Sequence, residues 1–453
     1  MSGGRATAGA PASSYWALFV LFLANIFNVG DRIIFGVVVQ PIKLELALSD
    51  TQLSLASGLF FVLFNLVGGL FIARMVDRGN RIRILAAGVA AWSLATAATG
   101  LAQDFFSLSL ARIVVGIGEA TAFPAAMSLI PDLFRLEARG KAVAIFQSSS
   151  FIGIVGGTIL AGILGAALGW RSMFFACGLA GLAVAMLLLI SVPEPERESR
   201  TGESTMARGS YWTDLWEGCI RVLRLPGYLA LLLAFGISGM MVFVLGAWGP
   251  AFLLRSHGVP LAEVGVVIGP AVGGGGIAGT LFSGFLADRL VRWRGRAEDM
   301  LKIPLVTIPL SLPFMATFIY AESLAVTMGA AAIMNFLLSA AIPSTMNYAV
   351  NRTAAGDRGL TSTILLAANG LIGGALGPLI VGALSDWFAP VQGDDALRYA
   401  LAALLVTPLI GSIFFFAAYR QASRAAGKLD VRIIDQAHGG FQSPSGQSEI
   451  RSV

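Results

Sequence analysis

The chain has 453 residues, of which 56% are hydrophobic and only 13% are charged, and its formal net charge is +5. About a quarter of the residues of a soluble globular protein are charged, so this composition excludes a soluble protein and indicates an integral membrane protein. Two cysteines, Cys177 and Cys219, are too few for a disulfide framework, and we expect both to be unpaired.

Twelve apolar runs are long enough to cross a bilayer, which takes roughly 20 residues. A polar tail, residues 1–14, precedes the first run. That run is too long for the core of a signal peptide and has no convincing cleavage site, so we expect it to remain as span 1. In chain order the runs are 15–39, 52–74, 83–102, 105–129, 141–167, 171–192, 228–254, 264–287, 302–320, 323–349, 360–385 and 398–419.

Basic residues predict the orientation of these spans. With the N-terminus inside the cell, 25 of the 31 Lys and Arg residues fall in cytoplasmic segments, four fall outside, and Arg32 and Arg112 fall within spans. The positive-inside rule therefore predicts that both termini are cytoplasmic and that the protein lies in the inner (plasma) membrane. Because the positive charge is distributed over the loops in this way, we expect no nucleic-acid partner.

The spans form two groups of six, separated by the longest hydrophilic break. We expect an N-terminal bundle at 15–192, a cytoplasmic linker at 193–227 and a C-terminal bundle at 228–423. The linker turns amphipathic at YWTDLWEGCIRVLRL, which predicts a short helix lying on the membrane surface. The segment 424–453 is polar and contains Gly and Ser, so we expect a disordered cytoplasmic tail.

The two halves repeat each other in sequence. Span 5 ends in GGTILAGILGAALGW (156–170) and span 11 ends in GGALGPLIVGALSDW (373–387), which align at an offset of 217 residues. The loop after span 2, ARMVDRGNR (73–81), similarly matches the loop after span 8, GFLADRLVR (284–292). These matches predict an all-α membrane protein whose twelve transmembrane helices form two pseudo-symmetric six-helix bundles.

The Asp-Arg pairs after spans 2 and 8 resemble the loop signature of major facilitator transporters, and the resemblance extends over spans 1–12. The second copy, with Gly284, Asp288 and Arg289, fits the signature well. The first copy departs from it, since Ala73 and Asn80 stand where glycines are usual. The resemblance implies alternating access, with a substrate site between the halves near the middle of the membrane.

A finer pattern is similar to the Spinster-type branch of this family. It comprises NVGDR in span 1, DRGNR after span 2, ARIVVGIGEA in span 4 followed by Pro124 and the run LIPDLF, and LIGGALGPLIVGALSD in span 11. The resemblance implies an amphipathic, lipid-like substrate of the sphingoid phosphate or lysophospholipid class. The anion:cation symporter branch shares the Asp-Arg of span 1 and the Gly-Glu of span 4. It remains the alternative and implies small organic anions such as sugar acids.

Charged residues within spans 1 and 4 are the candidates for proton coupling. A charge at the bilayer centre costs at least a few kcal/mol, so its retention indicates a function. At 1.5 Å per residue, Asp31 and Arg112 lie ~12 Å and ~10 Å below the outer ends of their spans, which makes an ion pair possible. Glu119 lies another ~10.5 Å inward, with no evident basic partner at its level.

Burial without a partner favours the neutral form of a carboxyl group. We therefore expect Glu119 to be the first candidate for a proton carrier and Asp31 the second. Arg112 would pair with Asp31 in one state and with a substrate anion or Glu119 in another. The alternative is a static buried salt bridge that fixes the packing of the helices.

Several uncharged polar residues and one arginine are candidates for the substrate cavity. Two alternatives are open for Arg32, which could point outward or meet an anionic head group. The C-terminal half has no comparable charge in its spans, and such a cavity suits a substrate with a polar head and an apolar tail. Hydrogen bonding between helices is the alternative for each uncharged residue. The candidates are Arg32, Asn28, Gln147, Ser148, Trp248, Asn335, Ser339 and Asn369.

The Asp-Arg loops are candidates for a cytoplasmic gate. Their acids and arginines stand at helix ends, where ion pairs and helix dipoles clamp neighbouring helices. We expect them to hold an outward-facing state; a solvated cluster that only sets topology is the alternative. The gate candidates are Asp77, Arg78, Arg81, Asp288 and Arg289.

Neither enzyme chemistry nor a cofactor is expected. The only histidines, His257 and His438, have no metal-ligand neighbours, and no nucleotide or hydrolase motif occurs. The expected partners are a small amphipathic substrate, protons and the bilayer, with a proton gradient as energy source and a monomer as the assembly. A channel is the remaining alternative class, and a repeated Asp-Arg loop with an intramembrane acid favours a transporter over a static pore.

Overall fold

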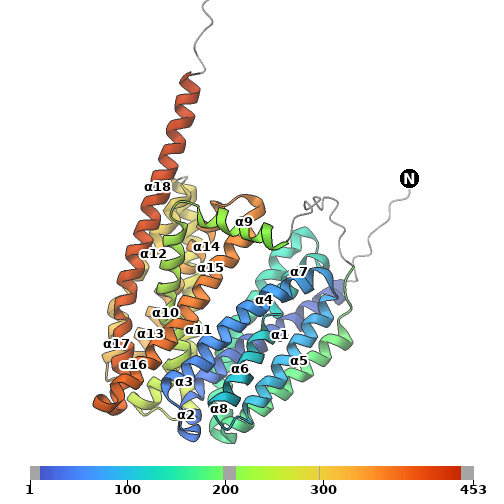
Figure 1. The fold of residues 1–453 in the computed structure, drawn as a ribbon, viewed down its shortest axis with the longest axis vertical. Coiled ribbons are helices and arrows are strands. Elements are labelled where there is room, and N and C mark those ends of the chain that lie inside the picture. Colours follow the sequence, from blue (N-terminus) through green and yellow to red (C-terminus); the bar gives the residue numbers. More distant parts are fainter. Residues whose placement is uncertain (1–10, 197–210, 295, 440–453) are drawn as a thin grey trace, which may run out of the picture.

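The computed structural model describes residues 11–196, 211–294 and 296–439, and every regular element in these ranges is a helix (Figure 1). The N-terminal half contains α1 (Pro11–Val37), α2 (Val39–Leu46), α3 (Asp50–Ser54), the π-helix η1 (Leu55–Phe60), α4 (Phe61–Arg78), α5 (Arg81–Thr99), α6 (Phe105–Glu119), α7 (Ala122–Leu133) and α8 (Leu136–Ser191).

The C-terminal half follows the linker with a similar series of helices. Its elements are α9 (Tyr211–Leu223), α10 (Tyr228–His257), α11 (Leu261–Arg294), η2 (Ala297–Leu301), α12 (Lys302–Tyr320), α13 (Leu324–Ser339), α14 (Ala341–Asn351), η3 (Ala355–Asp357), α15 (Arg358–Ala368), the π-helix η4 (Asn369–Leu376), α16 (Gly377–Gln392), η5 (Gly393–Asp395), α17 (Ala396–Ala403), η6 (Leu404–Val406) and α18 (Thr407–Gly439).

Ten helical stretches of the described residues are long and apolar enough to cross a membrane. Two of them contain 56 and 68 residues, Leu136–Ser191 and Arg358–Ala425. Each is interrupted by a glycine with positive φ, at Gly169 (76°) and Gly393 (54°). Since roughly 20 residues cross a bilayer, each long stretch supplies two crossings. The described residues thus make the twelve spans that the sequence predicts.

Span 4 and span 10 are each interrupted near the middle of the span. The break in span 4 separates α6 from α7 directly after Glu119, and the break in span 10 separates α13 from α14 directly after Ser339. A proline follows each break and has no N–H to bond to the carbonyl four residues earlier, which leaves Ala120 and Ser339 without that helical bond. The repeat places Pro124 and Pro343 so that both helices bend at mid-span.

The two bundles meet at one end of the molecule and diverge towards the other (Figure 1). We call the first the closed end, which holds residues 38–50, 255–260 and 386–396, and the second the linker end, which holds α9. The helix pairs that join the bundles include α1 with α10, α8 with α11, α3 with α16, and η1 with η4.

Small residues permit the approach at the closed end. Gly36 of α1 lies against the Gly246 carbonyl of α10, and Gly265 of α11 lies against the Thr158 carbonyl of α8. A Cβ on either glycine would overlap with these atoms.

The apolar core is also shared between the bundles at the closed end. One buried cluster fills the C-terminal bundle and continues into the N-terminal bundle at the closed end, for example at Phe35, and a second lies within the N-terminal bundle.

The linker and the last helix were only partly predicted. Helix α9 lies within the predicted amphipathic segment, while residues 197–210 lie outside the described part. The expected disordered tail from residue 424 is not found at its start, because α18 continues to Gly439. Residues 421–439 contain several Ala, Arg and Lys residues and no proline, so helical propensity extends the helix beyond its apolar part. Residues 440–453 lie outside the described part.

Candidate functional site

A buried cluster of charged side chains joins α1 to α6 in the N-terminal bundle. The Glu119 side chain is fully buried, and its Oε2 lies 2.5 Å from Nε of Arg32. The Nδ2 of Asn28 donates a hydrogen bond of 3.2 Å to the Glu119 backbone carbonyl, directly before the break in span 4. Among the described residues, Glu119 Oε1 has no hydrogen-bond partner.

The Arg32–Glu119 pair corrects one expectation from the sequence, that Glu119 lacks a basic partner at its level. The guanidinium side chain of Arg32 is 41% exposed, so its contact with an anionic head group stays a prediction. Side chains on a helix lean towards its N-terminus, so the Arg32 side chain leans back from the closed end. Because of this direction and the length of an arginine side chain, the guanidinium of Arg32 reaches the depth of Glu119, although the backbone of Arg32 lies nearer the closed end.

Asp31 and Arg112 do not form the ion pair that their depths allowed. Asp31 accepts a hydrogen bond of 2.5 Å from Thr96 Oγ1 on α5, and its other oxygen has no hydrogen-bond partner among the described residues. The Arg112 guanidinium instead packs over two aromatic rings, 5.0 Å from the centre of Phe35 and 5.3 Å from that of Phe61. These rings stabilise the cation without neutralising it.

The buried cluster therefore has unused hydrogen-bonding capacity. Arg112 is 1% exposed, yet its Nε and Nη1 donate to no described residue. The Phe61 ring also contacts the guanidinium of Arg32, at 5.2 Å from its centre. Two guanidinium groups thus face one aromatic ring, and Arg32 also pairs with the Glu119 carboxylate. Such groups can exchange partners when a proton or an anion binds, because some of their polar atoms form no hydrogen bond with a described residue in the observed state.

The polar patch of span 5 lies beside span 1. Asn25 Nδ2 donates hydrogen bonds to Ser149 Oγ at 2.7 Å and to Ser150 Oγ at 3.0 Å. The neighbouring candidates Gln147 and Ser148 are exposed. The half-exposed guanidinium side chain of Arg32 belongs to the same helix as Asn25, and these groups remain candidates for contact with a substrate.

Two of the four candidates in the C-terminal half are occupied in packing. Trp248 is buried and donates a hydrogen bond of 3.2 Å to the carbonyl of Pro378, and Asn335 is buried and donates to the carbonyl of Val272. Ser339 is also buried, whereas Asn369 is half-buried. In this conformation, Trp248 and Asn335 therefore fit the alternative interpretation, which is hydrogen bonding between helices.

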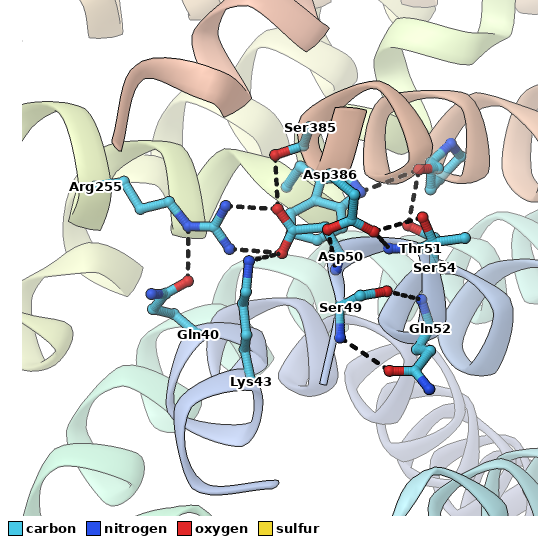
Figure 2. Close-up of polar contacts among 12 residues, drawn as sticks. Gln40, Lys43, Ser49, Asp50, Thr51, Gln52, Ser54, Arg255, Ser385 and Asp386 are labelled. Carbon is cyan, nitrogen blue, oxygen red and sulfur yellow. Dashed lines mark hydrogen bonds and ion pairs between the residues drawn. The ribbon is translucent and has the colours of Figure 1, made fainter. Parts of the chain in front are cut away.

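A second charged cluster joins the two bundles at the closed end, and sequence reasoning missed it. Figure 2 shows Asp50, which is 1% exposed, at its centre. Its carboxylate accepts hydrogen bonds from Arg255 Nη1 and Nη2 at 2.7 and 2.9 Å, from Lys43 Nζ at 2.6 Å and from Ser385 Oγ at 2.6 Å. Lys43 and Asp50 belong to the N-terminal bundle, whereas Arg255 and Ser385 belong to the other.

Asp386 completes this cluster by capping a helix of the opposite bundle. Its carboxylate accepts hydrogen bonds from the backbone N–H of Asp50 (2.9 Å) and Thr51 (2.8 Å), and from Thr51 Oγ1 (2.5 Å), at the start of α3 (Figure 2). Ser49 and Gln52 form a capping box at the same helix start. The capping box could be read from LSDTQ, but no signal in a single sequence pairs it with span 11.

The predicted gate residues lie at the linker end, away from the contact between bundles. Asp77, Arg78, Asp288 and Arg289 are exposed there. Arg81 differs, since it is buried and pairs within its own bundle with Asp132 and with Glu194, the latter at 2.6 Å. This position makes Arg81 a clamp between the ends of spans 3, 4 and 6.

A charge-reversed counterpart of this clamp lies in the C-terminal bundle. Glu298 stands 217 residues after Arg81, the offset of the sequence repeat, and pairs with Arg352 at the end of span 10 at 3.1 Å. The two halves thus have an ion pair at corresponding positions, but the acid and the arginine have changed places between them.

Comparisons with known proteins identify the family of the chain. The family model of the Major Facilitator Superfamily matches residues 21–298. An MFS-type efflux pump of Mycolicibacterium smegmatis is 29% identical over 412 residues, covering 90% of this chain and 93% of that protein. The probable galactarate/D-glucarate transporter GudP of Bacillus subtilis is 28% identical over 331 residues, covering 66% of this chain and 70% of that protein.

A solved structure is similar over nearly the whole chain. It is the crystal structure of a bacterial homologue of the human lysosomal transporter Spinster, in an inward-facing and unoccupied conformation, with a TM-score of 0.82 and 25% sequence identity. The match covers 92% of this chain and 99% of that one. The named relatives are transporters and an efflux pump, in line with the expectation of transport rather than catalysis. Since the family model covers more than half of its residues, the chain belongs to the Major Facilitator Superfamily, as a multi-pass membrane transporter similar to the Spinster homologues.

Proposed function

We propose that the protein is a proton-coupled secondary active transporter that works by alternating access on an amphipathic, lipid-like substrate of the sphingoid phosphate or lysophospholipid class. The observation that carries the proposal is the contact of Arg32 with the fully buried Glu119 between α1 and α6. A buried acid with one unpartnered oxygen, held by a cation that is 41% exposed, is suited to releasing that cation on protonation.

Charge balance supplies the coupling. Asp31 and Glu119 balance Arg32 and Arg112 when all four are ionised. A proton on Glu119 removes one negative charge, weakens the ion pair and leaves an excess positive charge next to the exposed part of Arg32. An anionic head group is then bound more tightly, and by linkage its binding favours the proton. Asp31 is the second proposed proton site.

The substrate class is supported by the distribution of charge. The fixed charges lie in the N-terminal bundle, while the candidates in the C-terminal bundle are Ser, Asn and Trp. This asymmetry suits a molecule with one charged head and an apolar tail. The similarity to the Spinster homologue supports the Spinster-type resemblance, which implies the same class.

A small organic anion such as a sugar acid is the second candidate substrate. The specific observation in its favour is Arg112, a buried guanidinium with two nitrogens that donate to no described residue, beside the guanidinium of Arg32. Two cations are suited to a compact dianion. The likeness to the B. subtilis sugar-acid transporter supports this alternative.

We further propose an inner-membrane location with both termini in the cytoplasm. The closed end then faces outward and the conformation is inward-facing, the state named for the similar Spinster homologue. In the opposite state, the exposed Asp77 and Asp288 loops at the linker end would hold the bundles together. The cluster around Asp50 would separate in that state.

A substrate panel in proteoliposomes tests the proposal. Purified protein is reconstituted, a pH gradient is imposed, and uptake of a lysophospholipid, a sphingoid phosphate and a hexarate is compared with uptake without the gradient. We expect saturable, gradient-dependent movement of one or both lipids. Movement of the hexarate alone would transfer the assignment to the sugar-acid class, and passive conduction that does not saturate would exclude a transporter.

A further inference from the structure

One exposed face of the last span changes from apolar to basic along its length. Val406, Leu409, Ile413 and Phe416 expose between 48% and 66% of their surface, at spacings of three and four residues. Arg420 and Arg424 continue the same spacing and are exposed as well. Residues at these intervals lie on one side of a helix. We call this set, Val406 to Arg424, the α18 stripe.

A pocket lies at the basic end of the α18 stripe. It has a volume of about 380 Å³ and is lined by Phe416, Tyr419, Arg420, Ser423 and Arg424. Neither of these arginines forms an ion pair with a described residue. The ammonium of Lys302 lies nearby, 5.8 Å from the centre of the Tyr419 ring, but it is paired with Asp299. The pocket therefore combines aromatic walls with two uncompensated guanidinium groups.

The length of the stripe matches one leaflet of a bilayer. From Val406 to Phe416 the helix rises ~15 Å, which is half of the ~30 Å hydrocarbon core. Arg420 and Arg424 then lie ~6 and ~12 Å farther along the axis, at the depth of the head groups. The apolar part would thus lie against acyl chains, and the arginines against the layer of phosphates.

We propose that the α18 stripe is a binding site for a phospholipid with an anionic head group. Its phosphate would lie between Arg420 and Arg424 in the pocket, and an acyl chain would follow Phe416 and Ile413 towards Val406. Basic pockets at the ends of transmembrane helices hold such head groups. A soluble anion would make no use of the apolar part, and a zwitterionic lipid would gain little from two cations. The inference is independent of the transported substrate.

Native mass spectrometry of the full chain in detergent tests the site. The protein is titrated with phosphatidylglycerol, phosphatidylcholine or inorganic phosphate, and bound species are counted. We expect Arg420→Gln/Arg424→Gln to weaken phosphatidylglycerol binding about 30-fold, from the effect of two basic residues at a membrane surface, and to leave phosphatidylcholine binding unchanged. Arg420→Lys/Arg424→Lys should retain most of the affinity, since both charges remain.

A matched control removes two positive charges elsewhere. Arg83 and Arg292 are exposed, and neither belongs to the sites described above. The Arg83→Gln/Arg292→Gln variant should bind phosphatidylglycerol as the wild type does. All variants change exposed side chains, and size-exclusion chromatography confirms their folding. An equal loss in the control, equal effects on both lipids, or binding of inorganic phosphate as tight as that of phosphatidylglycerol would overturn the proposal. So would a wild-type dimer that the stripe variant converts to monomers, because the stripe would then be a protein interface.

Discussion

At the scale of single residues, the state of Glu119 decides what the buried cluster can do. Its side chain has no exposed surface, and Arg32 is its ion-pair partner at 2.5 Å. A buried charge that loses its partner is strongly destabilising, whereas a neutral carboxyl group tolerates the same surroundings. In the proposed mechanism, protonation of Glu119 therefore weakens the ion pair and favours release of Arg32.

A double-mutant cycle should find strong coupling between Arg32 and Glu119. We expect the effects of Arg32→Gln and Glu119→Gln on the free energy of unfolding to be non-additive by about 1–3 kcal/mol, because the two side chains share one ion pair. Chemical unfolding of the purified variants in detergent provides the measurement.

The pair Asp31 and Arg112 is the internal control for this cycle. These residues share no hydrogen bond among the described residues, so their coupling should be clearly smaller than that of Arg32 with Glu119. Equal coupling in the two cycles would mean that the observed partners of the cluster are not those of the protein in solution.

At the scale of elements, an ion pair and the packing of buried Val222 hold α9 against the C-terminal bundle. The Arg221 guanidinium donates hydrogen bonds of 3.0 and 3.1 Å to Asp357, which lies just before α15, and Gly218 permits close contact with Leu360. These hydrogen bonds hold the pKa of the Asp357 carboxyl below its ordinary value. A lowered pKa means that the contact stabilises docking above the ordinary pKa of aspartate and is lost as the pH falls through the lowered value.

We predict that Arg221→Gln loosens α9 at neutral pH but not in strong acid. Hydrogen exchange of residues in α9 should be faster in the variant at pH 7, and the difference from wild type should vanish once Asp357 is protonated. The exposed neighbour Arg224, changed to Gln, serves as a control with the same loss of charge. Equal acceleration by both variants would indicate a general effect of charge on the linker rather than this contact.

At the scale of the whole molecule, a cluster of charged residues holds the closed end together. Each bundle contributes one acid and one base to this cluster, so its own charges balance. Lys43 and Asp50 lie in the N-terminal bundle, and Arg255 and Asp386 in the other. In the observed state Asp50 binds Arg255, and Asp386 caps α3 (Figure 2). When the bundles separate, Lys43 can keep Asp50, and Asp386 becomes available to Arg255. Opening therefore leaves no unbalanced charge in either bundle.

Asp50→Asn should favour opening of the closed end. The variant keeps the size of the side chain but removes the charge that Arg255 and Lys43 share. A cysteine placed at the buried Ser54 in a background without Cys177 and Cys219 should react with a maleimide at least about tenfold faster, which corresponds to about 1.4 kcal/mol. Asp395→Asn, an exposed acid at the same end, should leave the rate unchanged. An unchanged rate in Asp50→Asn would show that the cluster does not hold the closed end together.

The sequence was sufficient to predict the spans, the repeat and the family, because hydrophobic length and the Asp-Arg loops depend only on local pattern. It also indicated Asp31, Arg112 and Glu119 as residues within the membrane. It could not predict how they pair. The direction of the Arg32 side chain, Thr96 as the partner of Asp31, and the rings of Phe35 and Phe61 depend on the packing of several helices.

The closed-end cluster was missed for the same reason. Asp50 and Asp386 are separated by 336 residues, and each looks like an ordinary acid at the end of a span. Only the packing of span 2 against span 11 joins them. The length of α18 was misjudged for a different reason, since polar composition does not distinguish a disordered tail from a solvated helix.

Proton-driven transport by the Glu119→Gln variant tests the account most directly. In proteoliposomes with an imposed pH gradient, we predict that this variant folds and binds substrate but no longer responds to the gradient, because its neutral amide cannot release a proton. Glu263→Gln, which changes an exposed glutamate of α11, should keep gradient-driven uptake. Full gradient-dependent uptake by Glu119→Gln would contradict the proposed role of the buried pair and with it the mechanism of coupling.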